Sequence, residues 1–159
     1  MNDYLALQAI NVISDLLRHS LAENHPEPKI YNKLVELIDK FYTKKNWAID
    51  YINFELLLLQ ELGYGLDLRN CAVTGETENL THISPKTGRS VSEPVAQNYL
   101  DRLLALPKFL INPCFNYNTD DLIAGFKITS YFLEKKMLNL SKKLPLSRKI
   151  FIDKILNTN

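Results

Sequence analysis

The sequence predicts a mainly α-helical fold, a bundle of about six helices that carries a small loop or β-hairpin insert at about residues 66–93. Apolar residues recur at helical spacing along most of the chain, and this periodicity is interrupted between residues 66 and 93, where Gly, Thr, Ser and Asn become frequent. With 159 residues, of which 46% are apolar, the chain can bury one core without disulfides or a metal. We therefore expect a single domain over residues 1–159.

The first two helices are expected before residue 45. Apolar residues of the first run from Leu5 to Leu21, and the pattern stops at the proline-rich segment 25–28. Pro28 suits the first turn of a second helix, which the apolar pattern continues to Phe41.

The third helix is expected at residues 47–62, with Asn46 as its cap and Gly63 after its end. It is apolar around most of its circumference, which is typical of a helix in the middle of a bundle. Glu55 lies on the apolar side, so we expect it to be buried and to need hydrogen-bond donors. The nearest donors in sequence are backbone amides between Gly63 and Gly65. We predict that Glu55 anchors this loop, and a catalytic acid is the alternative.

Within the insert, residues 81–83 are typical of a short strand and residues 85–88 of a turn. Helical periodicity resumes at Ser92, which can act as a cap, and continues through Leu104 to Pro107.

The last two helices follow a loop that ends near residue 118. Thr119 is the expected cap of a long fifth helix, with Asp120 and Asp121 at its positive end. Pro145 is expected to end it, and Ser147 to cap the final helix.

Charge is distributed unevenly behind a net value of +1. Residues 1–126 hold 11 Lys and Arg against 16 Asp and Glu, a net −5, whereas residues 127–159 hold 8 against 2, a net +6. Such asymmetry is typical of a surface that binds nucleic acid or another polyanion, and a solvated helical face is the alternative. The basic residues that we expect to contact phosphates are Lys127, Lys135, Lys136, Lys142, Lys143, Arg148, Lys149 and Lys154.

Two aromatic residues lie among these cations. An outward-facing Tyr131 or Phe132 would stack on an unpaired base. We expect instead that Phe132 is in the core and that Tyr131 lies at its rim.

Enzyme and metal-site motifs are missing from the sequence. It contains no G-x-S-x-G, no phosphate-binding P-loop and no dinucleotide fingerprint. Zinc needs four ligands in local pairs, but the insert offers only Cys71 and the distant His82. We expect a protein without catalytic residues, metal or cofactor.

The cellular setting is predicted from cysteine use and hydropathy. Cys71 and Cys114 lie far apart and form no disulfide framework, which is typical of a reducing compartment. No run resembles a secretory signal or could span a bilayer. We expect a cytoplasmic protein with no membrane contact.

Five segments carry a resemblance to a known family. They are FELLLLQELGYGLDL at residues 54–68, CAVTG at 71–75, SPKTGR at 84–89, LALP at 104–107 and PLSR at 145–148. With them the chain resembles the C-terminal region of the bacterial recombination mediator RecO. The resemblance implies a helical domain with a small hairpin insert, in a non-enzymatic protein that binds and anneals single-stranded DNA. It also implies work with RecR and with the tail of single-stranded-DNA-binding protein, to promote RecA loading during recombinational repair.

The sequence departs from the family pattern in three places. Relatives usually begin with an OB-fold domain of roughly 80 residues, and nothing here alternates like its five strands, so we expect a truncated gene product or an excised domain. Some relatives carry four cysteines in the insert, where this chain keeps only Cys71, so hydrogen bonds and packing must hold the insert. Many relatives carry Arg immediately before Phe54, where this chain has Asn53. We therefore expect no strong pocket for the acidic tail at that position.

Three functional interpretations follow. The leading one is a repair protein whose basic C-terminal residues form one continuous cationic surface for single strands, together with a docking face for repair partners. The second is a protein-interaction scaffold with no DNA binding of its own. The third is an inert remnant that still folds.

Overall fold

The computed structural model describes residues 3–23, 25–43, 47–139 and 142–158. Within them the chain forms six α-helices, two short 3-10 helices and a three-stranded antiparallel sheet. The α-helices are α1 (Asp3–Ser20), α2 (Pro28–Thr43), α3 (Trp47–Glu61), α4 (Glu93–Ala96), α5 (Thr119–Asn139) and α6 (Leu146–Thr158). This confirms the predicted mainly α-helical fold with a small β insert. Asn46, the predicted cap of α3, lies outside the described residues.

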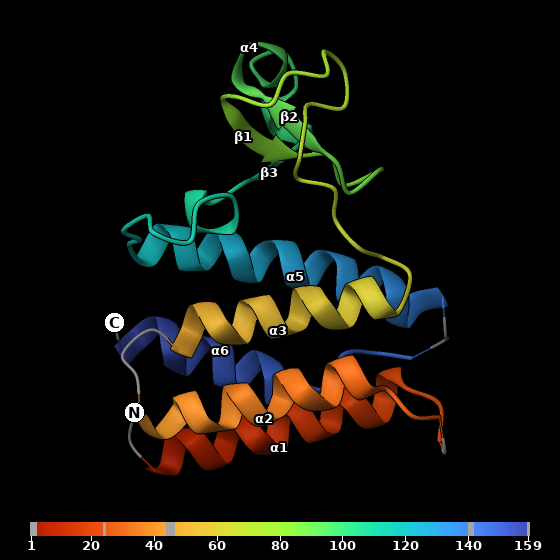
Figure 1. The fold of residues 1–159 in the computed structure, drawn as a ribbon, viewed down its shortest axis with the longest axis vertical. Helices are drawn as coiled ribbons and strands as arrows, with labels where there is room; N and C mark the ends of the chain where they lie inside the picture. The colour runs from red at the N-terminus through yellow and green to blue at the C-terminus, as the bar shows by residue number, and fades with distance from the viewer. Residues whose placement is uncertain (1–2, 24, 44–46, 140–141, 159) are drawn as a thin grey trace.

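The five long helices stack in layers, and the sheet with α4 lies at one end of the stack (Figure 1). Helices α1 and α2 form the layer farthest from the sheet, α3 and α6 lie above them, and α5 lies between these helices and the sheet. The helix α3 contacts both α2 and α5, while α6 contacts both α1 and α5. The predicted central position of α3 is therefore confirmed.

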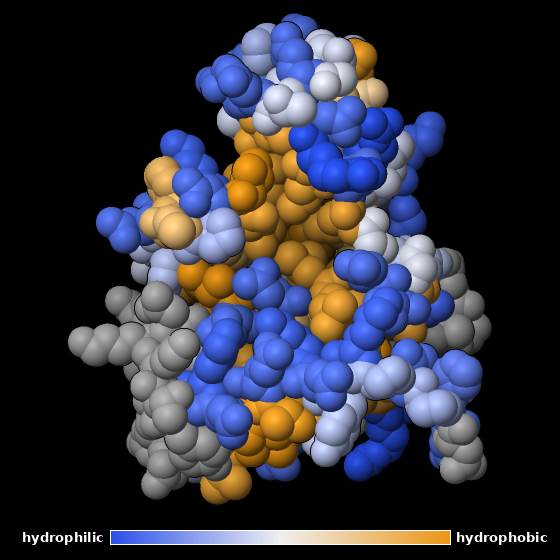
Figure 2. Space-filling view, in the orientation of Figure 1, coloured by the Kyte–Doolittle hydropathy of each residue, from blue (hydrophilic) through white to orange (hydrophobic). Residues whose placement is uncertain are grey.

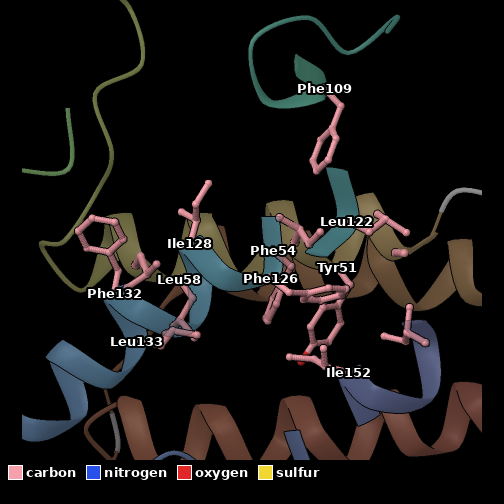
Figure 3. Packing of buried hydrophobic residues seen from close by; sticks show 14 of the residues in the cluster. Tyr51, Phe54, Leu58, Phe109, Leu122, Phe126, Ile128, Phe132, Leu133 and Ile152 are labelled. Carbon is pink, nitrogen blue, oxygen red and sulfur yellow. The ribbon is translucent and has the colours of Figure 1, made fainter. Parts of the chain in front are cut away.

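Aromatic side chains join the layers in the core. The Tyr51 ring of α3 lies 6.2 Å from the Phe126 ring of α5 and 5.4 Å from the Phe151 ring of α6, measured between centroids. Figure 3 shows Tyr51 and Phe126 pointing toward each other between their helices. Trp47 extends the group, with its ring 5.9 Å from that of Phe151. Burying such large rings supplies much of the hydrophobic stabilisation of the bundle.

The sheet has the strand order β2-β1-β3, with β1 (Leu80–Ile83) in the middle, β2 (Ser90–Ser92) and β3 (Leu104–Ala105). The central Ile83 is opposite Ser90 on one side and Leu104 on the other. The turn between β1 and β2 is closed by the Gly88 amide, which donates to the Ser84 carbonyl at 2.8 Å. The predicted strand and turn are confirmed.

The predicted helix from Ser92 to Pro107 is wrong. Helix α4 has only four residues, a 3-10 turn follows at Leu100–Arg102, and Leu104 belongs to β3. Backbone pairing of Leu104 with Ile83 of β1 overrides the local helical pattern, because tertiary contacts outweigh differences in propensity.

The ends of α5 also differ from the prediction. Asn118, rather than Thr119, caps the helix: its Oδ1 accepts from the Asp121 amide at 2.9 Å, and Asp121 Oδ2 accepts from the Asn118 amide at 3.1 Å. This reciprocal pair satisfies two backbone donors that the helix itself leaves free. Residues 142–145 are not helical, so the predicted continuation of this helix to Pro145 is wrong.

Ser147 does not cap α6. It is the second residue of that helix, and its hydroxyl donates to Asp15 Oδ2 of α1 at 3.0 Å. This side chain fixes the start of α6 against α1.

Apolar surface is exposed between the two parts of the fold. Figure 2 shows a hollow lined by apolar residues between the sheet and the helices, whereas polar residues cover most of the helical surface below it. No described helix combines the length and apolar character that a membrane crossing requires.

The Asn118 cap generates a stability prediction. Asn118→Ala removes the acceptor for the Asp121 amide and should lower the free energy of unfolding by about 1 kcal/mol, as measured by urea denaturation followed by circular dichroism. Asn116→Ala, an exposed asparagine in the same loop, is the control and should leave it unchanged. Equal stability of both variants would contradict the assigned cap.

Candidate nucleic-acid interface

The eight basic residues predicted to contact phosphates lie on three consecutive segments. Three are on α5, two on the segment that joins α5 to α6, and three on α6: Lys127, Lys135 and Lys136, then Lys142 and Lys143, then Arg148, Lys149 and Lys154. Arg148 is buried and Lys154 packs against α1, so the predicted single continuous cationic surface does not include all eight residues.

Arg148 is not a surface cation, which corrects its assignment as a phosphate contact. It is 3% exposed, and its Nε and Nη2 donate to Glu55 Oε1 and Oε2 at 2.6 and 2.7 Å. Further donations from Nη2 and Nη1 reach Thr129 at 3.0 Å and Ser130 at 2.9 Å. A two-pronged pair of this kind occupies both carboxylate oxygens and ties α3, α5 and α6 together.

Burial and the neighbouring carboxylate have opposite effects on the pKa of Arg148. Burial alone would lower the pKa of the Arg148 guanidinium, but the adjacent Glu55 carboxylate outweighs it and raises that pKa, so Arg148 stays charged. Burial, reinforced by Glu55, also raises the pKa of Tyr51 well above its ordinary value and keeps the phenol neutral.

The predicted burial of Glu55 is confirmed, but its predicted partner is wrong. Glu55 is fully buried and binds Arg148 rather than the loop amides. The loop is closed by its own backbone: the amides of Gly63 and Tyr64 donate to carbonyls of α3 at 3.0 and 2.8 Å. Gly63 ends the helix with φ +83°, a conformation that glycine adopts without strain, and a Cβ on Gly65 would lie 3.3 Å from Gln60.

Four lysines gather at the end of the bundle where α1, α3 and α5 finish. We call Lys135, Lys136, Lys142 and Lys143 the terminal lysine group. The ammonium of Lys136 lies 3.5 Å from the Leu62 carbonyl and that of Lys142 donates to the His19 carbonyl at 2.9 Å. These carbonyls lie at or just beyond helix C-termini, where a cation is favourable.

The described contacts of the terminal lysine group are with neutral atoms. Lys135 reaches the Pro85 carbonyl at 3.4 Å, and Lys143 is exposed. In the described part of the chain no ion pair joins any of the four lysines to a carboxylate. Contact with neutral carbonyls orients an ammonium without cancelling its field, so this end of the bundle remains positive.

Lys154 lies apart from this group. Its ammonium is 3.2 Å from Gln8 Oε1 and 4.9 Å from the centroid of the Tyr4 ring, both on α1. Lys154 therefore contacts the N-terminal half of α1, whereas Lys142 contacts His19 at the C-terminal end of the same helix.

A groove of about 540 Å³ runs between α5 and α6, within the size range of small-ligand sites. Its lining is mostly apolar and includes Ile123, Phe126, Leu144, Pro145, Leu146, Ile152 and Leu156. Lys127 and Lys149 line it from opposite helices, and Arg148 and Ser130 add polar atoms. Two acids, Glu134 and Asp153, also border it.

The fold brings to α5 one basic residue that is not among the eight predicted. Because Lys135 touches the Pro85 carbonyl, the exposed Lys86 of the turn lies beside α5. The two lysines are about fifty residues apart in the chain, and no local pattern connects them.

The insert is held by a buried thiol. Cys71 Sγ accepts hydrogen bonds from both the amide and the hydroxyl of Ser92 at 3.3 Å. The Ser92 side chain therefore makes no capping hydrogen bond to α4, although the sequence predicts it as a cap. Burial opposes ionisation, but hydrogen bonds from Ser92 and Thr74 outweigh it and lower the pKa of Cys71 to about 6. Among the described residues, no three His, Cys, Asp or Glu side chains form a group that could hold a metal.

Comparison with known proteins identifies similar chains. The sequence matches the family model described as "Recombination protein O C terminal" over residues 1–145. It is 39% identical over 157 residues to the DNA repair protein RecO of Hyphomonas neptunium, covering 98% of this chain and 65% of that protein. It is 40% identical over 155 residues to that of Wolbachia pipientis wMel, covering 92% and 65%. The chain therefore spans just under two thirds of the length of these relatives.

The buried ion pair generates a second stability prediction. Arg148→Met leaves the Glu55 carboxylate buried without a partner and should cost about 3–5 kcal/mol in the free energy of unfolding. The double variant Glu55→Leu with Arg148→Met should recover most of this loss, because no unpaired charge remains. Lys149→Met, one residue away and exposed, is the control. Urea denaturation measures all three, and a cost below about 1 kcal/mol for Arg148→Met would contradict the role given to the pair.

Proposed function

This chain belongs to the RecO family, through its match to the RecO C-terminal domain, and from that premise we propose that it acts in DNA repair and recombination by binding single-stranded DNA without sequence specificity. We further propose that it is not an enzyme and that it docks repair partners, RecR and the single-stranded-DNA-binding protein, to promote annealing and RecA loading. The terminal lysine group carries the first part of this proposal.

The charge distribution supports binding to phosphates. The C-terminal fifth of the chain has a net charge of +6, and burial of Arg148 against Glu55 removes only one of its eight cations from the surface. The terminal lysine group is not neutralised by carboxylates in the described residues, so neutralisation by phosphates would release counterions from the strand. Lysine binds phosphate as a point charge, which gives affinity without sequence readout.

A purely structural role for these lysines is the alternative that the contacts allow. Lys136 and Lys142 lie against carbonyls at helix ends, and such contacts stabilise a helix by about 0.3–1 kcal/mol each. The two roles predict different results when the charges are reversed. A purely structural role predicts a slightly lower stability and an unchanged affinity for DNA, whereas a binding role predicts a loss of that affinity.

Charge reversal tests the DNA-binding proposal. Changing all four residues of the terminal lysine group to Glu should abolish most binding to a labelled oligonucleotide at low salt, measured by fluorescence anisotropy. For the unmodified chain the logarithm of affinity should fall with the logarithm of salt concentration, and each lysine converted to Gln should reduce that slope by about 0.7.

The control makes the same change in net charge elsewhere. Reversing Lys29, Lys33, Arg102 and Lys108, which lie on α2 and beyond the insert, should leave most of the affinity intact. If the variant with four Glu residues in the terminal lysine group binds DNA as tightly as the unmodified chain, the assignment of DNA binding to that group is overturned.

The groove between α5 and α6 favours a second candidate function, a docking module for protein partners. Its lining is mostly apolar, with Lys127 and Lys149 contributed by the two helices and with the acids Glu134 and Asp153 beside them. In this proposal the two lysines bind the acidic groups of a peptide while its apolar side chains fill the groove. We propose this groove for the acidic tail of the single-stranded-DNA-binding protein. Asn53 is half-buried on α3 and offers no positive charge at the position where many relatives have Arg.

A peptide titration tests the docking proposal. The tail peptide should bind saturably by isothermal calorimetry, and Lys127→Glu with Lys149→Glu should weaken it about tenfold or more through like-charge repulsion. A peptide of the same composition in reversed order is the control. Saturable peptide binding without DNA binding would favour the scaffold interpretation, and absence of both would favour the inert remnant.

A further inference from the structure

Tyr131 is an exposed aromatic side chain on a basic helix. It is 39% exposed, whereas its neighbour Phe132 is 4% exposed and belongs to the core. The two rings meet edge to face, with centroids 5.2 Å apart at an angle of 83°. The buried Phe132 therefore supports the Tyr131 ring from the protein side while part of that ring remains open to solvent.

Lysines flank Tyr131 along α5. Lys127 and Lys135 are four residues before and after it, so all three share one side of the helix, about 6 Å of helix rise apart at each step. The ammonium of Lys135 touches the Pro85 carbonyl, which brings exposed Lys86 to the end of the series. We call Lys127, Tyr131, Lys135 and Lys86 the basic-aromatic row.

Two more exposed tyrosines, Tyr31 and Tyr4, lack this setting. Tyr31 of α2 is 66% exposed, but the residues four positions before and after it are Glu27 and Val35. Tyr4 is 59% exposed, but Lys154 lies over its ring at 4.9 Å. Tyr131 thus combines an accessible ring with cations on both sides.

We propose that the basic-aromatic row is a binding site for an unpaired nucleotide segment, in which a base stacks on Tyr131 while Lys127, Lys135 and Lys86 bind the adjoining phosphates. The proposal rests on the DNA-binding function proposed above and adds the residue that recognises the single-stranded state. An unpaired base has a free face for stacking, whereas bases inside a duplex already stack on their neighbours. Every base has such a face, so the site tolerates any sequence. The exposed acid Glu134 borders the row, and its single negative charge is outweighed by the three lysines.

The experiment compares two strands that carry the same phosphates. Fluorescence anisotropy measures the affinity of the full chain for a labelled oligothymidylate and for an abasic strand of equal length. Tyr131→Ala should weaken binding to the oligothymidylate about fivefold or more, should leave its salt slope unchanged, and should have no effect on the abasic strand. Tyr131→Phe keeps the ring and should bind like the unmodified chain.

Two further variants separate stacking from loss of fold. Tyr31→Ala removes an even more exposed ring from α2 and should change neither affinity. Tyr131→Trp should retain binding and its added indole emission should be quenched by the oligothymidylate but not by the abasic strand, while the chain's own buried Trp47 supplies the background.

The outcomes distinguish this inference from the function on which it rests. If the unmodified chain fails to bind either strand at low salt, the DNA-binding function itself is wrong and the inference falls with it. If the chain binds but Tyr131→Ala matches Tyr31→Ala on both strands, or the tryptophan variant shows no quenching specific to bases, binding is retained and the stacking role of Tyr131 is overturned.

Discussion

The buried pair of Glu55 and Arg148 is the constraint on which the arrangement of the C-terminal helices depends. It joins α3 to α6, and through Thr129 and Ser130 it includes α5. A buried ion pair contributes little net stability compared with apolar residues, but any packing that separates its partners is strongly penalised. The pair therefore selects one position of α6 against α5. That position sets the width of the groove and the side from which Lys149 approaches it.

This constraint divides the basic residues by role. Arg148 serves the interior, Lys154 contacts α1, and the terminal lysine group lies where three helices end. Helix C-termini carry partial negative charge, so lysines there both complete the local structure and leave the surface positive. A structural role and a binding role are thus compatible at the same side chains. The terminal lysine group and the basic-aromatic row share Lys135, so the two sets of cations contribute to one positive region of the surface.

The sequence was sufficient for features that depend on local pattern. The apolar circumference of α3 predicted that Glu55 is buried, and glycine at the end of that helix predicted where it stops. The partner of Glu55 was not predictable, because Arg148 is 93 residues away and stands among lysines, where charge counting treats it as one more surface cation. The short α4 was missed for a related reason: Leu104 fits a helical repeat, and only pairing with Ile83 makes it a strand residue. The misplaced α5 cap was an error of one residue, since Asn118 and Thr119 are both good capping residues.

The central claim is that single strands lie along the exposed side of α5 and the bundle end next to it. Photo-crosslinking of the intact chain to an oligothymidylate, followed by peptide mapping, tests it most directly because it locates bases rather than inferring them from affinity. Crosslinks are expected at Tyr131 and in the peptides that contain Lys135, Lys136, Lys142 and Lys143. Crosslinks confined to α2 or to the face of the sheet away from α5 would contradict it.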